Sequence, residues 1–276
     1  IVNACRNMPY GVQQPAVSAQ LRALEDSLGT QLFRRRPFAL TAAGKTLYGY
    51  AKPFFSGLET IERGLRGLAD LQLRVAGPSE LLRFHVPELF ERMRQRRTRL
   101  QLKLFERNQH EAIRLIEHGD CSLAVTVKEP GLSGGFESRT LARLPLVIMH
   151  PAGRGRLKPV ARQLDDAVTP GQPLIAPPHG ETITRIFRDG LAVRGASWPT
   201  QIEAIGREQI AAYVRHHLGL GLWAETPGAP APEGTRRELL DDFERLEIHA
   251  FWREPLSEVE SEFLELLEAR ARDYPA

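Results

Sequence analysis

The stretch from Gln14 to Gly29 constrains the fold most strongly, because it reads as one short helix with two different faces. Proline at the second position suits a first helical turn, where its missing N–H has no partner, and Gly29 suits the position after the last turn. Apolar residues recur at steps of four, three and four, which is typical of a helix with one buried stripe. They are Val17, Leu21, Leu24 and Leu28.

The opposite face of this helix is small or polar and carries no acidic residue. It presents Pro15, Ser18, Ala19 and Arg22. Short side chains permit close approach to a major groove, where hydroxyl and guanidinium groups reach base edges and phosphates. We expect contacts to base edges from Gln14, Pro15 and Ser18, and a phosphate contact from Arg22.

Three consecutive arginines, Arg34, Arg35 and Arg36, follow shortly after the helix. In a winged helix-turn-helix, the tip of a hairpin meets the DNA backbone or the minor groove at this point. Residues 1–57 hold seven Lys or Arg residues against two acidic ones, whereas the whole chain has a net charge of only +3. Taken alone, the helix could be an amphipathic surface helix, and the three arginines could be a solvated basic run. The helix followed by the arginines in this order indicates DNA binding.

The segments QPAVSAQLRALEDSLGTQLF and LTAAG, which begin at Gln14 and Leu40, resemble the DNA-binding domain of LysR-type transcriptional regulators. The resemblance implies a winged helix-turn-helix, a linker helix that dimerises and an effector domain shaped like a periplasmic binding protein. The first helix of that domain has no counterpart, the turn at 8–13 is longer than usual and the wing at 34–39 is shorter. We therefore expect an N-terminally truncated chain that binds DNA poorly as it stands.

A second amphipathic segment covers residues 41–70, with Thr41 as the expected N-cap. Its apolar residues alternate in steps of four and three, as in helices that pair with another helix. They are Leu47, Ala51, Phe54, Leu58, Ile61, Leu65 and Leu68. A single amphipathic helix is the alternative, and Pro53 should kink the helix nearby. The resemblance favours a dimer or a dimer of dimers, which would place two recognition helices on a pseudo-palindromic site.

From residue 71 onward, strands and helices alternate, which implies two α/β lobes with open, largely parallel sheets and a cleft between them. The expected strands are 71–76, 100–105, 121–127, 144–150, 173–177, 200–204, 220–224 and 247–252. The expected helices are 79–97, 109–118, 182–193, 208–218 and 257–272. Pro/Gly-rich segments at 151–159 and 227–234 mark the expected crossings between the lobes.

These expectations define an α+β multidomain fold. A winged helix-turn-helix covers residues 1–57 and a linker helix covers 41–70. A two-lobed α/β effector domain covers 71–276, with the first lobe at 71–150 and 246–276 and the second at 160–235.

Ligands in such folds bind where strands end and helices begin. The candidates at these places are Pro78, Ser79, Asn108, Thr126, Pro178, His179, Thr182 and Arg207. Ser79 and Thr182 are the strongest, because a hydroxyl at a helix N-terminus suits a carboxylate, although each could equally be an ordinary N-cap. Glu80 and Glu181 count against a strongly anionic effector if they face inward.

Other chemistry finds little support in the sequence. Cys5 and Cys121 have no ligand spacing, the histidines form no metal motif, and no nucleophile elbow or phosphate loop occurs. We expect no catalysis, cofactor or membrane span, and a cytoplasmic protein that binds an unidentified small effector. One alternative is a solute-binding or sensor module whose DNA-binding part has decayed, and an enzyme on the two-lobed scaffold is a more distant one.

Overall fold

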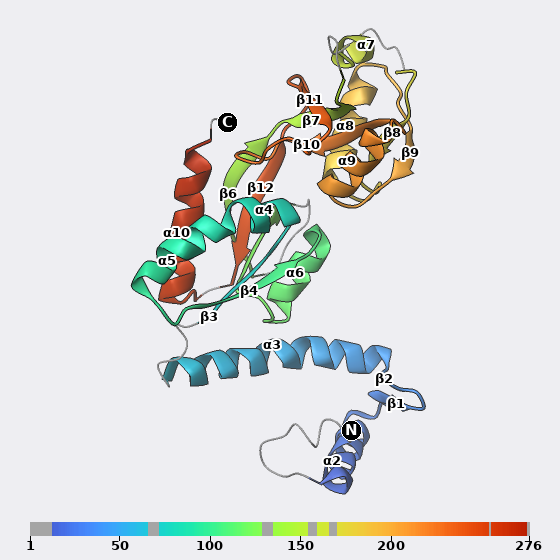
Figure 1. The fold of residues 1–276 in the computed structure, drawn as a ribbon. Helices are drawn as coiled ribbons and strands as arrows, with labels where there is room; N and C mark the ends of the chain where they lie inside the picture. Colours follow the sequence, from blue (N-terminus) through green and yellow to red (C-terminus); the bar gives the residue numbers. More distant parts are fainter. Residues whose placement is uncertain are drawn as a thin grey trace. The chain divides into compact units, whose positions relative to one another are not determined.

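The computed structural model describes residues 13–65, 72–128, 135–153, 159–165, 170–253 and 255–274 (Figure 1). Backbone contacts divide the chain into one unit of residues 1–61 and another of residues 62–276. None of the helices in these described ranges combines the length and the apolar composition that crossing a membrane requires.

The first unit contains a helix, a two-stranded wing and a second helix. α2 (Gln14–Leu28) has proline in its first turn and ends at Gly29, whose φ of 62° lies in the left-handed region that favours glycine. β1 (Phe33–Arg35) and β2 (Phe38–Leu40) form an antiparallel hairpin, and α3 (Ala42–Leu65) follows. The order predicted from the sequence is confirmed. α3 is one continuous helix through the position of Pro53, so the kink expected there does not interrupt it.

Side-chain hydrogen bonds tie the wing of this unit to both helices. A Glu25 carboxylate oxygen accepts the backbone N–H groups of Leu32 and Phe33, at 2.8 and 3.0 Å. The Thr41 hydroxyl donates to the carbonyl of Gln31 and accepts the N–H of Gly44 at 3.0 Å, so Thr41 is the N-cap of α3 as predicted. These hydrogen bonds hold the segment that leads into the wing against α2 and the start of α3.

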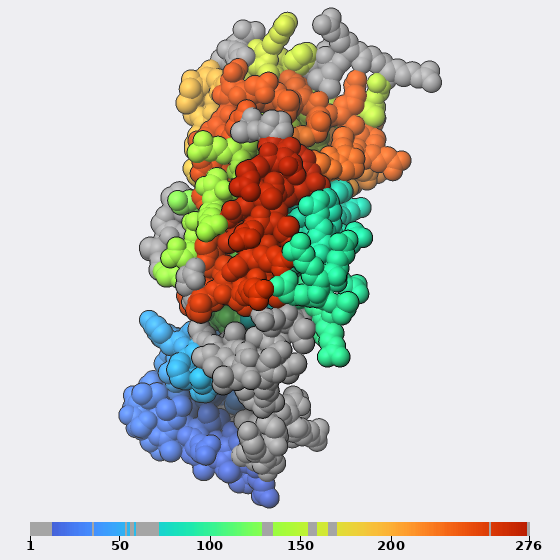
Figure 2. Space-filling view, turned by 90° about the vertical axis from the view of Figure 1, so that its left-hand side faces the viewer, coloured from blue at the N-terminus to red at the C-terminus, as the bar shows by residue number. Residues whose placement is uncertain are grey.

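The first lobe is a five-stranded sheet in the order β4-β3-β5-β12-β6, with helices on both faces. Its strands are β3 (Gln72–Gly77), β4 (Gln101–Glu106), β5 (Leu123–Val127), β6 (Glu137–Leu144) and β12 (Leu246–Trp252). Its helices are α4 (Ser79–Phe84), α5 (Val86–Arg96), α6 (Gln109–Glu117) and α10 (Glu258–Arg272). α5 and α10 share one apolar core with the sheet and lie side by side on its surface (Figure 2), whereas α6 packs on the opposite face.

The second lobe is another five-stranded sheet, in the order β11-β7-β10-β8-β9. Its strands are β7 (Leu146–Pro151), β8 (Leu174–Ala176), β9 (Thr200–Glu203), β10 (Leu220–Ala224) and β11 (Thr235–Leu240). Its helices are α7 (Ala161–Asp165), α8 (Thr182–Val193) and α9 (Arg207–Arg215). α7 and α8 pack on one face of this sheet and α9 on the other.

The predicted lobe boundaries are wrong, because β7 and β11 both belong to the second sheet. The chain crosses between the lobes at Pro145 and again at 241–245. The described ends of the Pro/Gly-rich segment at 151–159, and the whole segment at 227–234, lie within the second lobe. The sheets are also mixed and not largely parallel, since β12 pairs antiparallel with both of its neighbours and β7 does the same.

The single helix expected at 79–97 is divided in two at His85. Pro87 lies in the first turn of α5, where a proline without an N–H is tolerated, and it therefore starts a new helix. This division separates the short α4 from the helix that covers the core.

Candidate nucleic-acid interface and effector cleft

The predicted DNA-reading residues lie on the uncovered face of α2. Gln14, Pro15 and Arg22 are exposed, and Ser18 is half-buried. The apolar stripe of the same helix is only partly covered, because Leu24 and Leu28 are 40% and 50% exposed. Val17 and Leu21 of the same stripe are half-buried.

The wing places its arginines at and beside the turn of the hairpin. Arg34 pairs with Ala39 across the two strands, Arg36 lies in the turn, and both arginine side chains are exposed. The side chain of Arg35 lies outside the described residues. Phe33 and Phe38 stack with ring centroids 5.5 Å apart, which stiffens the base of the hairpin.

The predicted dimerisation seam lies along α3. Leu47, Phe54 and Leu58 are 36%, 64% and 45% exposed, and Ala51 is half-buried. The side chains of Ile61 and Leu65, and all of Leu68, lie outside the described residues. An apolar row of this exposure on a helix indicates a surface that another helix can cover.

The predicted effector residues of the first lobe lie around the ends of β3, β4 and β5. Pro78, and not Ser79, is the N-cap of α4, so the hydroxyl of Ser79 does not cap that helix. Asn108 does cap its helix, because its side-chain oxygen accepts the N–H of Glu111 at 2.9 Å. Thr126 is buried on β5.

In the second lobe, the predicted residues surround the start of α8. Thr182 is buried, and the N-cap of this helix is Glu181, so the reading of Thr182 as an ordinary N-cap is wrong. His179 and its neighbour Pro178 precede the helix, and the imidazole of His179 lies 3.6 Å from a carboxylate oxygen of Glu203. Both side chains of that pair are largely exposed.

Of the eight predicted effector residues, Arg207 makes side-chain contacts with the opposite lobe. Its guanidinium group lies over the ring of Phe84 of the first lobe at 5.8 Å, and it donates a hydrogen bond to the carbonyl of Pro230 in its own lobe. The neighbouring Glu208 pairs with Arg83 of α4 at 3.9 Å. The start of α9 therefore meets α4 at the junction of the two lobes.

Glu80 is the other buried charge of this junction, and it is not one of the residues predicted to bind the effector. It is only 9% exposed, and burial raises the pKa of its carboxyl group. Backbone N–H groups of Glu80 and Arg207 and the charge of Arg207 oppose this rise in pKa. Burial likewise lowers the pKa of Arg207, against the effects of Glu208 and Glu80.

His249 is a second buried polar residue that sequence reasoning missed. It lies on β12 opposite Thr126 and Thr140, and it is 4% exposed. Its Nε2 lies 3.4 Å from a carboxylate oxygen of Glu247, while its buried Nδ1 has no hydrogen-bond partner among the described residues. Polar side chains therefore interrupt the apolar core at this end of the first sheet.

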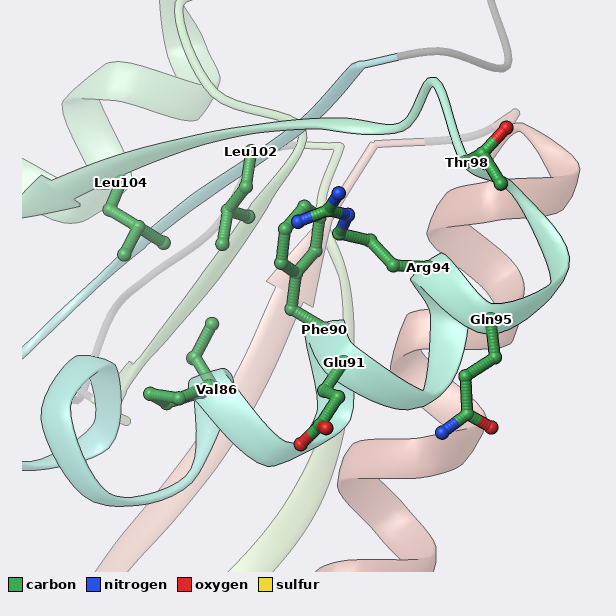
Figure 3. A pocket seen from close by; sticks show the side chains of 9 residues that line it. Val86, Phe90, Glu91, Arg94, Gln95, Thr98, Leu102 and Leu104 are labelled. Atoms are coloured by element: carbon green, nitrogen blue, oxygen red, sulfur yellow. The ribbon is translucent and has the colours of Figure 1, made fainter.

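A groove of about 520 Å³ lies elsewhere on the first lobe, between α5 and β4 (Figure 3). Val86, Phe90, Leu102 and Leu104 give it an apolar floor, and Arg94 is another of its lining residues. None of the predicted effector residues lines this groove. It is therefore a surface feature of the first lobe and not part of the predicted site.

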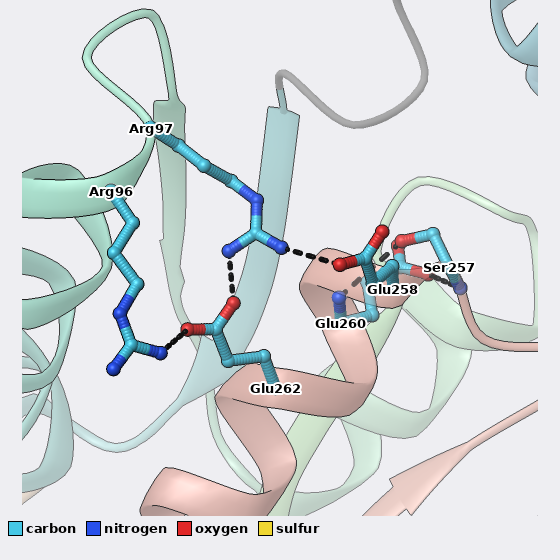
Figure 4. Close-up of polar contacts among 6 residues, drawn as sticks. All are labelled: Arg96, Arg97, Ser257, Glu258, Glu260 and Glu262. Carbon is cyan, nitrogen blue, oxygen red and sulfur yellow. Dashed lines mark hydrogen bonds and ion pairs between the residues drawn. The ribbon is translucent and has the colours of Figure 1, made fainter.

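The arginine-rich end of α5 is structural. Arg97 forms ion pairs with Glu262 and with Glu258, the latter at 3.0 Å, and Arg96 reaches Glu262 at 3.7 Å (Figure 4). α10 begins with a capping box in which Ser257 and the third-position glutamate bond each other's backbone. The ion pairs of Arg96 and Arg97 therefore join the end of α5 to α10.

The described cysteine has no reactive character. Cys121 is buried, and its thiol lies 2.7 Å from the carbonyl of Leu123, to which it donates. Burial raises the pKa of the Cys121 thiol to about 12. A thiol that stays protonated is a poor nucleophile and a poor redox sensor. Cys5 lies outside the described residues.

Both parts of the chain match known families. Residues 9–45 match the bacterial regulatory helix-turn-helix protein of the lysR family, and residues 66–272 match the LysR substrate binding domain. The HTH-type transcriptional regulator CbbR of Xanthobacter flavus is 27% identical over 237 residues, which cover 83% of this chain and 70% of the relative. The HTH-type transcriptional regulator IlvR of Caulobacter vibrioides is 27% identical over 254 residues, covering 88% and 84%.

Solved structures share the fold. The LysR family transcriptional regulator CbnR gives a TM-score of 0.65 at 17% identity, covering 94% of this chain and 90% of that structure. CbnR in complex with its target DNA gives 0.65 at 18% identity, covering 94% and 91%. The cofactor-binding domain of the Cbl transcriptional regulator gives 0.63 at 20% identity, covering 72% and 88%.

Proposed function

The chain belongs to the LysR family of transcriptional regulators, and we propose that it binds a pseudo-palindromic promoter site under the control of a small effector. The effector would bind between the two lobes of residues 72–274. Its binding would change the spacing of two recognition helices on the DNA. That spacing is a two-state element, and both the effector and the DNA can bias it. The proposal includes no catalysis and no cofactor.

The exposed, acid-free face of α2 beside an arginine-rich hairpin is the observation that carries the DNA-binding proposal. In this proposal Gln14, Pro15 and Ser18 read base edges in the major groove. Arg22 and the wing residues 34–36 contact phosphates, which adds affinity and salt dependence but little sequence information. A protein that acts on promoter DNA works in the bacterial cytoplasm.

The exposed apolar row on α3 supports assembly through that helix. Leu47, Phe54 and Leu58 would be covered by the same helix of a second copy, giving a dimer or a dimer of dimers. A twofold dimer presents two α2 helices to two half-sites, which accounts for a pseudo-palindromic target.

The effector proposal rests on polar groups that are buried at the ends of strands, where ligands of α/β folds bind. Thr126, Thr182 and Arg207 are buried and are the principal residues of the proposed site. Pro78, Ser79, Asn108, Pro178 and His179 remain predictions at its rim. The effector itself is a small molecule.

Selection of binding sites from random duplexes, followed by measurement of affinity, tests the DNA proposal. Ser18→Ala should reduce the preference for the selected duplex over a scrambled one by roughly tenfold. Ser27→Ala is the matched control, because Ser27 lies on the same helix and its hydroxyl donates to the carbonyl of Leu24. An unchanged preference in the Ser18 variant would remove this residue from the reading face.

A further inference from the structure

The two lobes are joined by two crossings of the chain, at Pro145 and at 241–245. Lobes joined in this way move relative to each other unless contacts outside the crossings hold them. The loop between β10 and β11, residues 225–234, belongs to the second lobe and lies against Tyr274, just after α10 of the first lobe. Figure 2 shows the C-terminal end of α10, in red, against the orange residues of the second lobe. The contacts of this loop therefore affect the angle between the lobes.

Gly228 of this loop and Tyr274 approach each other closely. A Cβ atom added to Gly228 would overlap the hydroxyl oxygen of Tyr274 and would lie 3.1 Å from its Cζ atom. Gly228 also has a φ of 71°, which lies in the left-handed region that favours glycine. Glycine at this position therefore permits both the turn of the loop and the close approach of the tyrosine ring.

The ring of Tyr274 is itself held by the first lobe. The imidazole ring of His85, at the break between α4 and α5, meets it in an edge-to-face arrangement with the ring centroids 5.8 Å apart. The guanidinium carbon of Arg270, on α10, lies 5.1 Å from the centroid of the tyrosine ring. Both kinds of contact are favourable. The ring therefore cannot swing away from Gly228 without losing contacts to its own lobe.

Two further contacts fix the loop. The carbonyl of Pro230 accepts a hydrogen bond from the guanidinium group of Arg207, which also lies over the ring of Phe84 on the first lobe at 5.8 Å. At the base of the loop, the backbone N–H of Glu225 donates to the carbonyl of Pro145 at the first crossing, over 2.8 Å. The loop is thus held at its base and near its middle, and it presents Gly228 to Tyr274.

We propose that residues 225–234 form a clasp that closes on Tyr274 and holds the two lobes in one orientation. A contact made in one orientation stabilises that orientation, so its loss shifts the balance between orientations. An effector that turned the lobes would have to displace Tyr274 from Gly228. This consequence rests on the proposed effector function of the cleft, whereas the clasp itself does not.

The distance between the lobes, measured in the full chain, tests the clasp. Spin labels are attached through Arg114→Cys on α6 and Arg188→Cys on α8, which are exposed positions on different lobes. The background is Cys5→Ser, and Cys121 remains because it is buried. Labelled protein is diluted with unlabelled protein so that distances within one chain dominate. Pulsed electron–electron double resonance without effector or DNA should give one narrow distance distribution.

Tyr274→Ala removes the ring that the clasp holds, so it should broaden the distance distribution and shift its mean. Tyr213→Ala is the matched control, because it makes the same change at a tyrosine of α9 that is 37% exposed. It should leave the distribution as in the wild type. An unchanged distribution in a folded Tyr274→Ala protein overturns the proposal.

Gly228→Ala tests the same contact from the second lobe and serves also if Tyr274→Ala does not fold. The added Cβ should displace the tyrosine ring and broaden the distribution. Gly195→Ala is its control, because Gly195 has a similar φ of 64° in the same lobe and carries the same backbone strain. No described atom lies within 4 Å of a Cβ added to Gly195. Equal distributions in the two alanine variants overturn the proposal.

These outcomes are separable from the proposed function, because the distances are measured without effector and without DNA. Failure of the distance test would reject the clasp and leave the regulator proposal standing. Absence of specific DNA binding or of an effector response would reject the regulator proposal and leave the clasp as measured.

Discussion

A Cβ atom added to Gly44 would lie 2.0 Å from the carbonyl oxygen of Leu32, which is itself buried at 2% exposure. This close approach seats the first turn of α3 against the segment that leads into the wing. No side chain fits at position 44 without moving backbone, so the glycine of the LTAAG segment is required by packing.

Gly44→Ala should therefore destabilise the N-terminal unit by about 1–3 kcal/mol, because the helix must shift away from the wing. Thermal unfolding and DNA affinity should both fall. Gly49→Ala on the same helix is the control: nothing lies within 4 Å of its added Cβ, and alanine should stabilise the helix by up to about 1 kcal/mol. Equal effects of the two substitutions would show that close packing at position 44 is not the cause.

Glu25 is an acidic residue that we expect DNA binding to need. Its carboxylate holds the N–H groups of Leu32 and Phe33, so Glu25→Ala should cost about 1–3 kcal/mol and weaken DNA binding, although the domain becomes more basic. Asp26→Ala removes the same charge from an exposed neighbour and should leave stability nearly unchanged. Tighter DNA binding by the Glu25 variant would contradict the assigned role.

The second lobe should lose stability in acid through Glu238. Burial alone would raise the pKa of this carboxyl group, but hydrogen bonds from His150 and from the N–H groups of Ala161 and Val160 lower it below the ordinary value of 4.5. A group whose folded-state pKa is depressed stabilises the fold above its unfolded-state pKa. That stability disappears as the pH falls through the folded-state pKa.

Urea unfolding at a series of pH values checks this linkage. The wild type should lose stability more steeply than Glu238→Gln once the pH falls below 4.5, and the two should converge in strong acid. Parallel pH profiles for the two proteins would contradict the depressed pKa of Glu238.

Cys121 should resist modification for as long as the protein is folded. Its thiol has a pKa of about 12, so very little thiolate forms at neutral pH. In a Cys5→Ser background, a thiol reagent such as Ellman's reagent should react slowly with the native protein and rapidly in denaturant. Fast native reaction would show that the thiol is accessible and ionised.

The elements with strong periodicity could be predicted from the sequence. α2 and α3 each have a clear apolar repeat with a capping residue, and these local signals persist in the structure. β6 and β11 were missed for a physical reason. Both are edge strands with several charged residues, as edges of sheets often are, so they lack the apolar alternation of a core strand.

The junction of the lobes could not be predicted, because it depends on contacts between segments far apart in the chain. From the sequence, Glu80 is only an acidic residue that would count against an anionic effector if it faced inward. Its burial beside Arg207 depends on how α4 and α9 meet, and no local pattern encodes that meeting. The predicted lobe boundaries failed similarly, since strand partners decide to which sheet β7 and β11 belong.

Binding of the protein, expressed from the complete reading frame of its gene, to DNA flanking that gene tests the central claim most directly. Affinity is measured for this duplex and for a scrambled duplex across a salt series. A sequence-specific regulator should prefer its own duplex, and the logarithm of its affinity should fall steeply with that of the salt concentration. Equal affinity for both duplexes, or binding that is insensitive to salt, would contradict the account.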